Sequence, residues 1–147
     1  MRKILIPPSL VLLSLILIVL FFVLFPDCNR IPFPYNLIGL LFIFTGIQLS
    51  GKSRDFFKKY VTASDFSRPS YFINEGIYKK TRNPMYLGMF YLLPGIAVCF
   101  QNLFSMLVLV LFMMIMNVFL IPFEEKAMED VFGDQYVEYK KSVRRWI

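Results

Sequence analysis

Apolar residues fill four long stretches of this chain, and polar residues gather between them. All four stretches, residues 4–25, 31–50, 84–100 and 103–121, carry no charged side chain. The second of them is shorter in its apolar part and leads into a charged segment. A helix needs about 20 apolar residues to cross a bilayer core of about 30 Å. The pattern therefore predicts an all-α integral membrane protein with about four transmembrane helices.

The segments between these stretches predict the rest of the architecture. Gln101 and Asn102 form a short polar break, so residues 84–121 should fold as a tight helical hairpin. Residues 51–83 form a polar, basic connection, and we expect the helix of the second stretch to continue into it. Residues 122–147 form a tail. We treat the whole chain as a single membrane domain.

The tail carries helix signals of its own. Gly133 is a candidate helix stop, and Asp134 is a candidate N-cap for a further helix. Tyr136, Tyr139 and Val143 then recur at helical spacing beside basic residues. This pattern is typical of an amphipathic helix that lies at a membrane surface.

The distribution of charge predicts the orientation. The sequence has 16 Lys and Arg against 10 Asp and Glu, and four spans would place 15 of the 16 basic residues on one side. Basic residues favour the cytoplasmic side. We therefore expect a protein of the cell (inner) membrane whose connection, tail and active site face the cytoplasm. No basic helix stands free of the apolar stretches, which argues against nucleic acid as a partner.

Composition excludes some chemistry. The sequence has no histidine, so neither histidine-ligated metal nor histidine acid–base catalysis is available. Cys28 and Cys99 are isolated, and Cys99 lies in an apolar stretch. We expect them to pack as small hydrophobic residues and predict no metal site. The sequence carries no signal for an oligomeric state.

The start of the third span combines charge with a helix N-terminus. Arg82 and Asn83 precede Pro84; Asn is a favourable N-cap, and Pro suits the first helical turn. Unpaired backbone N–H groups would then lie at the lipid–water boundary, where an anionic group can bind. An anchor for lipid headgroups is the alternative interpretation of these residues.

A pair of acids, Glu124 and Glu125, follows the last span. A solvated acidic first turn of a helix would explain them. Adjacent carboxylates beside the membrane are costly without a partner, however, which favours a role in holding a cation. The hairpin brings both polar clusters to one membrane face. A ligand with both charges, such as S-adenosylmethionine with its carboxylate, ammonium and sulfonium, suits a shared pocket.

Aromatic residues are spread through the connection. They are Phe56, Phe57, Tyr60, Phe66, Tyr71, Phe72 and Tyr78. Most are best explained as an interfacial aromatic belt. The alternative is a cap over a bound cofactor, in which the ring faces of Tyr78, Tyr86 and Tyr136 would contact a sulfonium.

Taken in order, these motifs resemble the isoprenylcysteine carboxyl methyltransferase family, and phospholipid N-methyltransferases share a similar pattern. The resemblance covers about half of the chain. It rests on Gly76-x-Tyr78, Arg82-Asn83-Pro84-Met85-Tyr86-Leu87-Gly88, Glu124-Glu125, Phe132-Gly133, Tyr136, Tyr139 and Val143-Arg144. It implies an integral membrane enzyme that converts S-adenosylmethionine to S-adenosylhomocysteine. The lipophilic methyl acceptor would enter from the bilayer.

The resemblance also implies roles for individual residues. Arg82, Asn83, Tyr86 and Gly88 match the first cofactor motif, and the paired acids match the second. The predicted cofactor-binding residues are Tyr78, Arg82, Asn83, Pro84, Met85, Tyr86, Gly88, Glu124, Glu125 and Tyr136. The candidate catalytic residues are Arg82, Asn83 and Glu125.

Two departures from the family pattern bear on the substrate. Asn83 stands where many relatives have His, and both side chains can donate a hydrogen bond. Leu120, Ile121 and Pro122 stand where many relatives carry an Arg before the paired acids. We favour an isoprenylcysteine-like carboxylate as the acceptor. A phospholipid amine or a small hydrophobic amine, thiol or phenol stays open.

Two other classes of protein compete with this interpretation. A small membrane reductase of the sterol-reductase type would need a nucleotide-phosphate site, for which the basic residues 79–82 are candidates. A non-catalytic four-helix membrane protein would explain the spans and the basic loops. It would not explain the ordered set of motifs.

Overall fold

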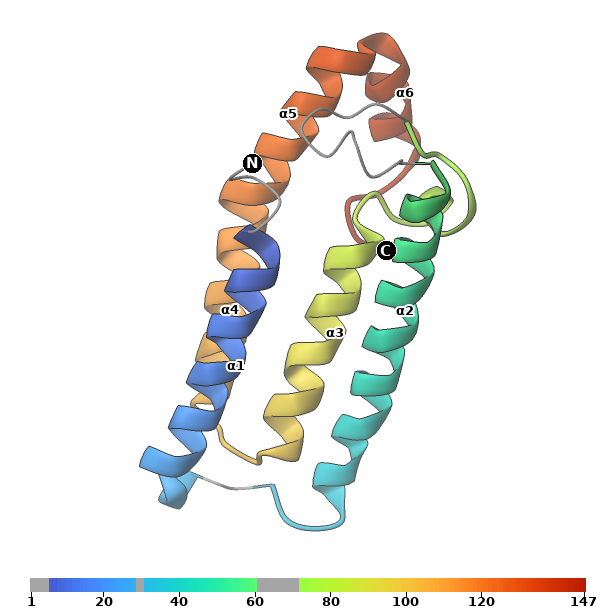
Figure 1. The fold of residues 1–147 in the computed structure, drawn as a ribbon. Coiled ribbons are helices and arrows are strands. Elements are labelled where there is room, and N and C mark those ends of the chain that lie inside the picture. The colour runs from blue at the N-terminus through green and yellow to red at the C-terminus, as the bar shows by residue number, and fades with distance from the viewer. Residues whose placement is uncertain (1–5, 29–30, 61–71) are drawn as a thin grey trace.

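The computed structural model describes residues 6–28, 31–60 and 72–147, and within these ranges it contains helices and no strand (Figure 1). This confirms the predicted all-α class. The elements in chain order are α1 (Ile6–Leu24), η1 (Pro26–Cys28), η2 (Tyr35–Leu37), α2 (Ile38–Tyr60), η3 (Gly76–Lys79), α3 (Pro84–Cys99), α4 (Ser105–Ile115), the π-helical η4 (Met116–Leu120), α5 (Ile121–Phe132) and α6 (Asp134–Ser142).

The long helices pair side by side (Figure 1). α1 packs on α4, α2 packs on α3, and α3 also contacts α1 and α4. α5 continues α4 beyond the N-terminal end of α3, and α6 folds back from it. The segment after α6 then returns to the start of α3, which brings the end of the chain close to the third helix (Figure 1).

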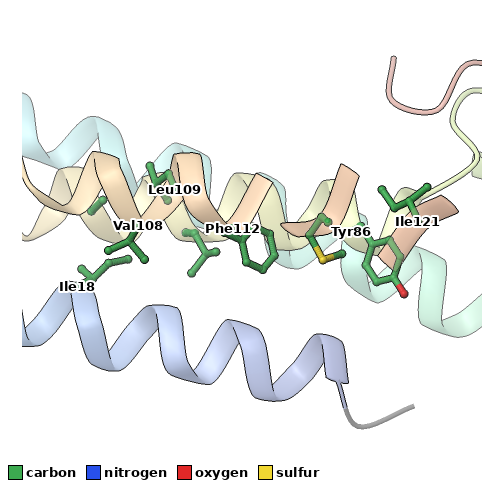
Figure 2. Close-up of a cluster of buried hydrophobic side chains, with 9 residues drawn as sticks. Ile18, Tyr86, Val108, Leu109, Phe112 and Ile121 are labelled. Carbon is green, nitrogen blue, oxygen red and sulfur yellow. The ribbon is translucent and has the colours of Figure 1, made fainter. Parts of the chain in front are cut away.

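The hydrophobic core lies where α1, α3 and α4 meet (Figure 2). Ile18 of α1 points towards Val108 of α4, and Tyr86 and Ile121 lie beside one another at one end of the cluster (Figure 2). Its buried members are Ile18, Tyr86, Leu93, Ala97, Val108, Leu109, Phe112, Met116 and Ile121. The core therefore extends to Tyr86, one of the predicted site residues.

Within the described residues, two helices are long and apolar enough to cross a membrane, Pro7–Leu24 and the continuous helix Ser105–Phe132. α3 is apolar but shorter, and the second half of α2 carries Lys52 and Arg54. Large apolar side chains are exposed along α1, α2 and α4, as contact with lipid requires. The number of membrane crossings and their orientation stay predictions.

Helix boundaries differ from the predicted spans at two places. The second span was predicted from residue 31, but α2 begins at Ile38, since Pro32 and Pro34 cannot donate the backbone hydrogen bonds of a helix. The last span was predicted to end at residue 121, but the helix continues through η4 and α5 to Phe132. The predicted continuation of the second helix into the connection is confirmed, because α2 extends to Tyr60. Residues 61–71 of the connection lie outside the described part.

The predicted break in the tail is confirmed, with one correction. α5 ends at Phe132, and Gly133 has a φ of 55°, a conformation that favours glycine. Gly133 rather than Asp134 occupies the N-cap position of α6. Asp134 is therefore the first residue of α6 and not its cap.

The predicted hairpin turn is also confirmed. Gln101 adopts a φ of 63° between α3 and α4. Asn102 is fully buried, and its Nδ2 donates to the carbonyl oxygens of Phe21 and Phe25, both at 3.1 Å. Its Oδ1 accepts from the Phe104 backbone N–H at 3.0 Å. This side chain joins the end of α1 to the hairpin.

α2 and α3 approach each other through glycines. Gly39 and Gly46 of α2 face Gly95 and Gly88 of α3. A Cβ added at Gly46 would lie 2.7 Å from the Gly88 carbonyl oxygen, and one added at Gly95 would lie 2.7 Å from the Gly39 carbonyl oxygen. Real Cβ atoms essentially never come so close to another atom. Small residues of this kind let membrane helices pack backbone to backbone.

We predict that Gly46→Ala destabilises the protein by about 1–3 kcal/mol, because the new methyl group meets backbone atoms that cannot rotate away. The unfolding midpoint in detergent should fall by about 3–10 °C. Gly51→Ala is the matched control, since a Cβ there meets nothing within 4 Å. Equal midpoints for the two variants would contradict the close packing.

Candidate functional site

The hairpin brings the two predicted motifs into contact. The Tyr86 hydroxyl of α3 donates to Oε1 of Glu124 in α5 at 2.5 Å, across 38 positions of the sequence. Arg82, just before α3, pairs with Glu125 through NH2 and Oε1 at 3.1 Å. The structure therefore brings together Arg82, Tyr86, Glu124 and Glu125, as the predicted hairpin requires.

Glu125 is the centre of an ion cluster, which we define as Arg82, Glu125, Glu129, Lys140 and Arg145. The Glu125 side chain is only 4% exposed. Arg145 contacts both of its oxygens, with Nε 3.2 Å from Oε1 and NH2 2.8 Å from Oε2. Lys140 lies 3.7 Å from Oε2 and 2.6 Å from Oε1 of Glu129. A buried carboxylate is stable only with such partners.

The motif before α3 is also held by the segment after α6, which we call the strap (residues 143–147). The Arg82 backbone N–H donates to the Arg144 carbonyl at 3.0 Å. The Thr81 hydroxyl and the Asn83 side-chain amide both donate to the Arg145 carbonyl, at 3.0 Å and 3.3 Å. Asn83 occupies the predicted N-cap position of α3 but makes no side-chain capping bond. The Asn83 side chain is hydrogen-bonded to the strap instead.

A tryptophan anchors the strap to the membrane helices. The Trp146 indole N–H donates at 3.0 Å to Oδ1 of Asn117, which lies in the π-helical η4. Its ring lies 6.3 Å from that of Phe90 and packs against the hydrophobic core. Sequence reasoning missed Trp146, Asn117 and Arg145. The only signal was an isolated Asn within an apolar stretch, which in a membrane helix indicates a polar partner.

Aromatic rings pack beside the ion cluster. Phe72 lies 5.1 Å from Tyr139 and 5.9 Å from Tyr136, both in edge-to-face geometry. The Tyr139 hydroxyl donates to the Tyr78 carbonyl at 2.6 Å, and the Tyr78 hydroxyl is 3.0 Å from the Ser53 hydroxyl. Phe72 thus lies against the tail as a cap would. Phe66 and Tyr71, two other aromatic residues of the connection, lie outside the described residues.

The phenols beside the cluster are held neutral. Burial, with the nearby charge of Glu125, raises the pKa of Tyr136 to about 12. Burial and then the neighbouring Tyr136 raise the pKa of Tyr139, and burial raises that of Tyr78 despite its hydrogen bond with Ser53. These groups remain hydrogen-bond donors at physiological pH, and their rings stay uncharged.

The remaining predicted site residues lie on α3. Pro84 and Gly88 are buried, and Met85 is half-buried. Gly88 faces α2, where an added Cβ would lie 2.8 Å from the Gly46 carbonyl oxygen and from the Ser50 backbone nitrogen. This contact explains a glycine at position 88 by helix packing. Its predicted part in cofactor binding stays a prediction.

A cavity of about 400 Å³ lies on the other side of the motif, towards α2. It contains none of the predicted cofactor-binding residues. Its lining is mainly apolar with two lysines: Leu49, Lys52, Phe56, Gly76, Ile77, Lys80, Thr81, Leu87 and Ile147. The cavity borders the strap, because Ile147 lines it together with Thr81, whose hydroxyl bonds to the Arg145 carbonyl.

The ion cluster fits a small zwitterion such as the amino-acid part of S-adenosylmethionine. Glu125 is the carboxylate with which an ammonium group would pair, in place of one of the cations that contact it in this structure. Among the residues described, the buried Nε–H of Arg82 has no hydrogen-bond partner, so one donor remains for an anion. Across the same residues no three His, Cys, Asp or Glu side chains gather as metal ligands do.

Comparisons with known proteins agree with the motifs. A family model described as phospholipid methyltransferase matches residues 35–135, which include both motifs. An uncharacterized protein of Haemophilus influenzae (strain KW20 / Rd) is 36% identical over 63 residues, which are 43% of this chain and the full length of that relative. No solved structure matches the chain.

We predict that Glu125→Gln destabilises the protein by about 3–5 kcal/mol, because Arg82 would lose its buried counter-charge. Glu129→Gln, which removes a partly exposed partner of Lys140, should cost about 0–1 kcal/mol. Thermal unfolding of both variants in detergent measures the difference. If Glu125→Gln unfolds like the Glu129 variant, the buried ion cluster does not stabilise the fold.

Proposed function

The chain belongs to the phospholipid methyltransferase family, which includes the isoprenylcysteine carboxyl methyltransferases, and from this premise we propose that it methylates a lipid-like acceptor with S-adenosylmethionine. The observation that carries the proposal is the pairing of Arg82 with Glu125 at 3.1 Å. It unites the two motifs in one buried cluster that can bind both an anion and a cation. Two helices able to cross a membrane agree with a membrane enzyme.

Each part of the cofactor has a partner in this proposal. Glu125 binds the ammonium group, and the free Nε–H of Arg82 with the Asn83 amide binds the carboxylate. Tyr86, which donates to Glu124, orients that second acid. The ring faces of Tyr78 and Tyr136 lie towards the sulfonium, where cation–π attraction stabilises a positive charge.

Methyl transfer requires mainly that the protein aligns the methyl donor with the acceptor. S-adenosylmethionine, when bound, supplies a methyl group on a positively charged sulfur. Transfer of that methyl group to an acceptor would be an in-line displacement, for which the hairpin and tail would have to hold the two reactants in register and exclude water. A carboxylate or thiolate acceptor needs no general base, which is compatible with a sequence that has no histidine. An amine acceptor would have to lose a proton, and a Glu or Tyr of the cluster could assist.

The cavity towards α2 is our candidate for the acceptor. Leu49, Leu87 and Ile77 give it apolar walls, and Lys52 and Lys80 bring positive charge to its lining. This combination suits an amphiphile with an acidic end group and an apolar tail that enters sideways from the bilayer. It supports an acceptor with an anionic group, such as an isoprenylcysteine-like carboxylate, over an acceptor whose only charge is an ammonium group.

We place the site at the cytoplasmic face of the inner membrane, with four spans, because 15 of the 16 Lys and Arg residues then lie on one side. Cysteines introduced at Gln101 and Ser142 test this in whole cells. We expect an impermeant maleimide to label position 101, in the hairpin turn, and not position 142, at the end of α6. Labelling of position 142 in intact cells would refute this topology.

A labelled-methyl transfer assay with purified protein tests the proposed reaction. We expect transfer to a prenylcysteine analogue, and little transfer to a phospholipid amine or a hydrophobic thiol. Lys52→Gln with Lys80→Gln should raise the KM for the acidic acceptor about 10-fold and leave kcat nearly unchanged, because both lysines act in binding. Lys126→Gln with Lys141→Gln, at two exposed positions of α5 and α6, is the charge-matched control.

Two results would change the proposal. Transfer to an amine or thiol instead of a carboxylate would reassign the acceptor within the same family chemistry. No transfer to any acceptor, with no binding of S-adenosylhomocysteine, would leave a non-catalytic membrane protein as the better account.

A further inference from the structure

Protein cations already surround the carboxylate of Glu125 in this structure. Arg82 and Arg145 contact Oε1 at 3.1 Å and 3.2 Å, and Arg145 also contacts Oε2 at 2.8 Å. Lys140 lies 3.7 Å from Oε2. The cluster sets two carboxylates, Glu125 and Glu129, against these three cations, so it already carries an excess of positive charge. A cationic group from a ligand can therefore reach Glu125 only if one protein cation leaves.

Of the three cations, Arg145 is the one best placed to leave. Arg82 is 9% exposed, and its NH1 also donates to the Lys140 carbonyl at 2.8 Å. Lys140 belongs to α6 and has Glu129 as its nearer partner. Arg145 is 31% exposed and belongs to the strap, which has no regular secondary structure. Water can solvate its guanidinium once it separates from Glu125.

The strap can move as a unit because few contacts hold it. The Arg144 and Arg145 carbonyls accept from the backbone of Arg82 and from the side chains of Thr81 and Asn83. Trp146 is bound through a single hydrogen bond to Asn117 and through ring packing. The Asn83 amide is bonded to the backbone carbonyl of Arg145, so it becomes free only if the strap backbone moves together with the Arg145 side chain. That amide and Glu125 are both assigned to the cofactor above.

We propose that Arg145 is a positioning residue that occupies the ammonium subsite of Glu125, so that cofactor binding requires the strap to release it. The inference rests on the proposed function. The strap keeps the buried carboxylate paired when no ligand is present, and the ligand's ammonium group takes over that pairing. Arg145 therefore competes with the cofactor rather than binding it.

Calorimetry with S-adenosylhomocysteine on the purified full-length chain tests the competition. Arg145→Gln should tighten binding by about 3- to 10-fold, because a larger fraction of the protein then has Glu125 free. Arg144→Gln is the matched control: it removes the same charge from the neighbouring position, where the side chain is exposed. Its affinity should stay within about twofold of the unmodified protein.

Fluorescence gives a second measurement that does not depend on the Arg145 variant. Trp146 is the one tryptophan in the sequence, so the emission of the protein reports on the strap. Saturating S-adenosylhomocysteine should shift the emission to longer wavelength and increase quenching by iodide. Asn117→Ala, which removes the anchor of the indole, should show part of this shift without ligand and should also bind more tightly.

The outcomes separate this inference from the proposed function. Weaker or unchanged binding by Arg145→Gln, or an unchanged Trp146 spectrum at saturation, would overturn the inference and leave the methyltransferase proposal intact. If neither the unmodified protein nor the Arg145 and Asn117 variants bind S-adenosylhomocysteine, both proposals fail. Tighter binding by both variants, with the spectral shift, is the expected result.

Discussion

The buried carboxylate of Glu125 is the constraint on which the polar end of the molecule depends. An ionised carboxylate that is 4% exposed needs compensating charge, and that charge comes from three separate parts of the chain. Arg82 precedes α3, Lys140 belongs to α6, and Arg145 belongs to the strap. One acid in α5 therefore determines where the hairpin, the tail helix and the strap lie relative to each other. The same acid is the one that we propose for the ammonium group of the cofactor.

Local signals in the sequence predicted much of this arrangement. The Gln101–Asn102 break predicted the hairpin, and once two helices are antiparallel neighbours, residues at their matching ends must meet. This is why Tyr86 and Glu124 could be expected to lie close together. Gly133 likewise marks the end of α5, because only glycine adopts its backbone conformation without strain.

The strap could not be predicted in this way. Its contacts join residues 144–146 to residues 81–83 and to Asn117, through backbone carbonyls and one indole. Every residue type has a backbone carbonyl, so the residue types do not reveal which carbonyls accept hydrogen bonds. An irregular segment also has no hydrophobic periodicity from which its contacts could be predicted. The role of Gly88 was open for a related reason, because a glycine required by helix packing and one required by a ligand look the same in a sequence. Only the position of Gly46 across the interface distinguishes the packing role.

The π-helical turn η4 lies between the apolar face of α4 and the paired acids of α5. A π turn adds a residue to the helix, and one residue corresponds to about 100° of rotation around the axis. Without that residue, the side chain at position 125 would turn away from Arg82 by roughly a quarter of the helix circumference. The π turn thus rotates the side chains of α5 about the helix axis relative to those of α4. The half in contact with lipid can change its sequence while the acids keep their direction, provided that the extra residue is retained.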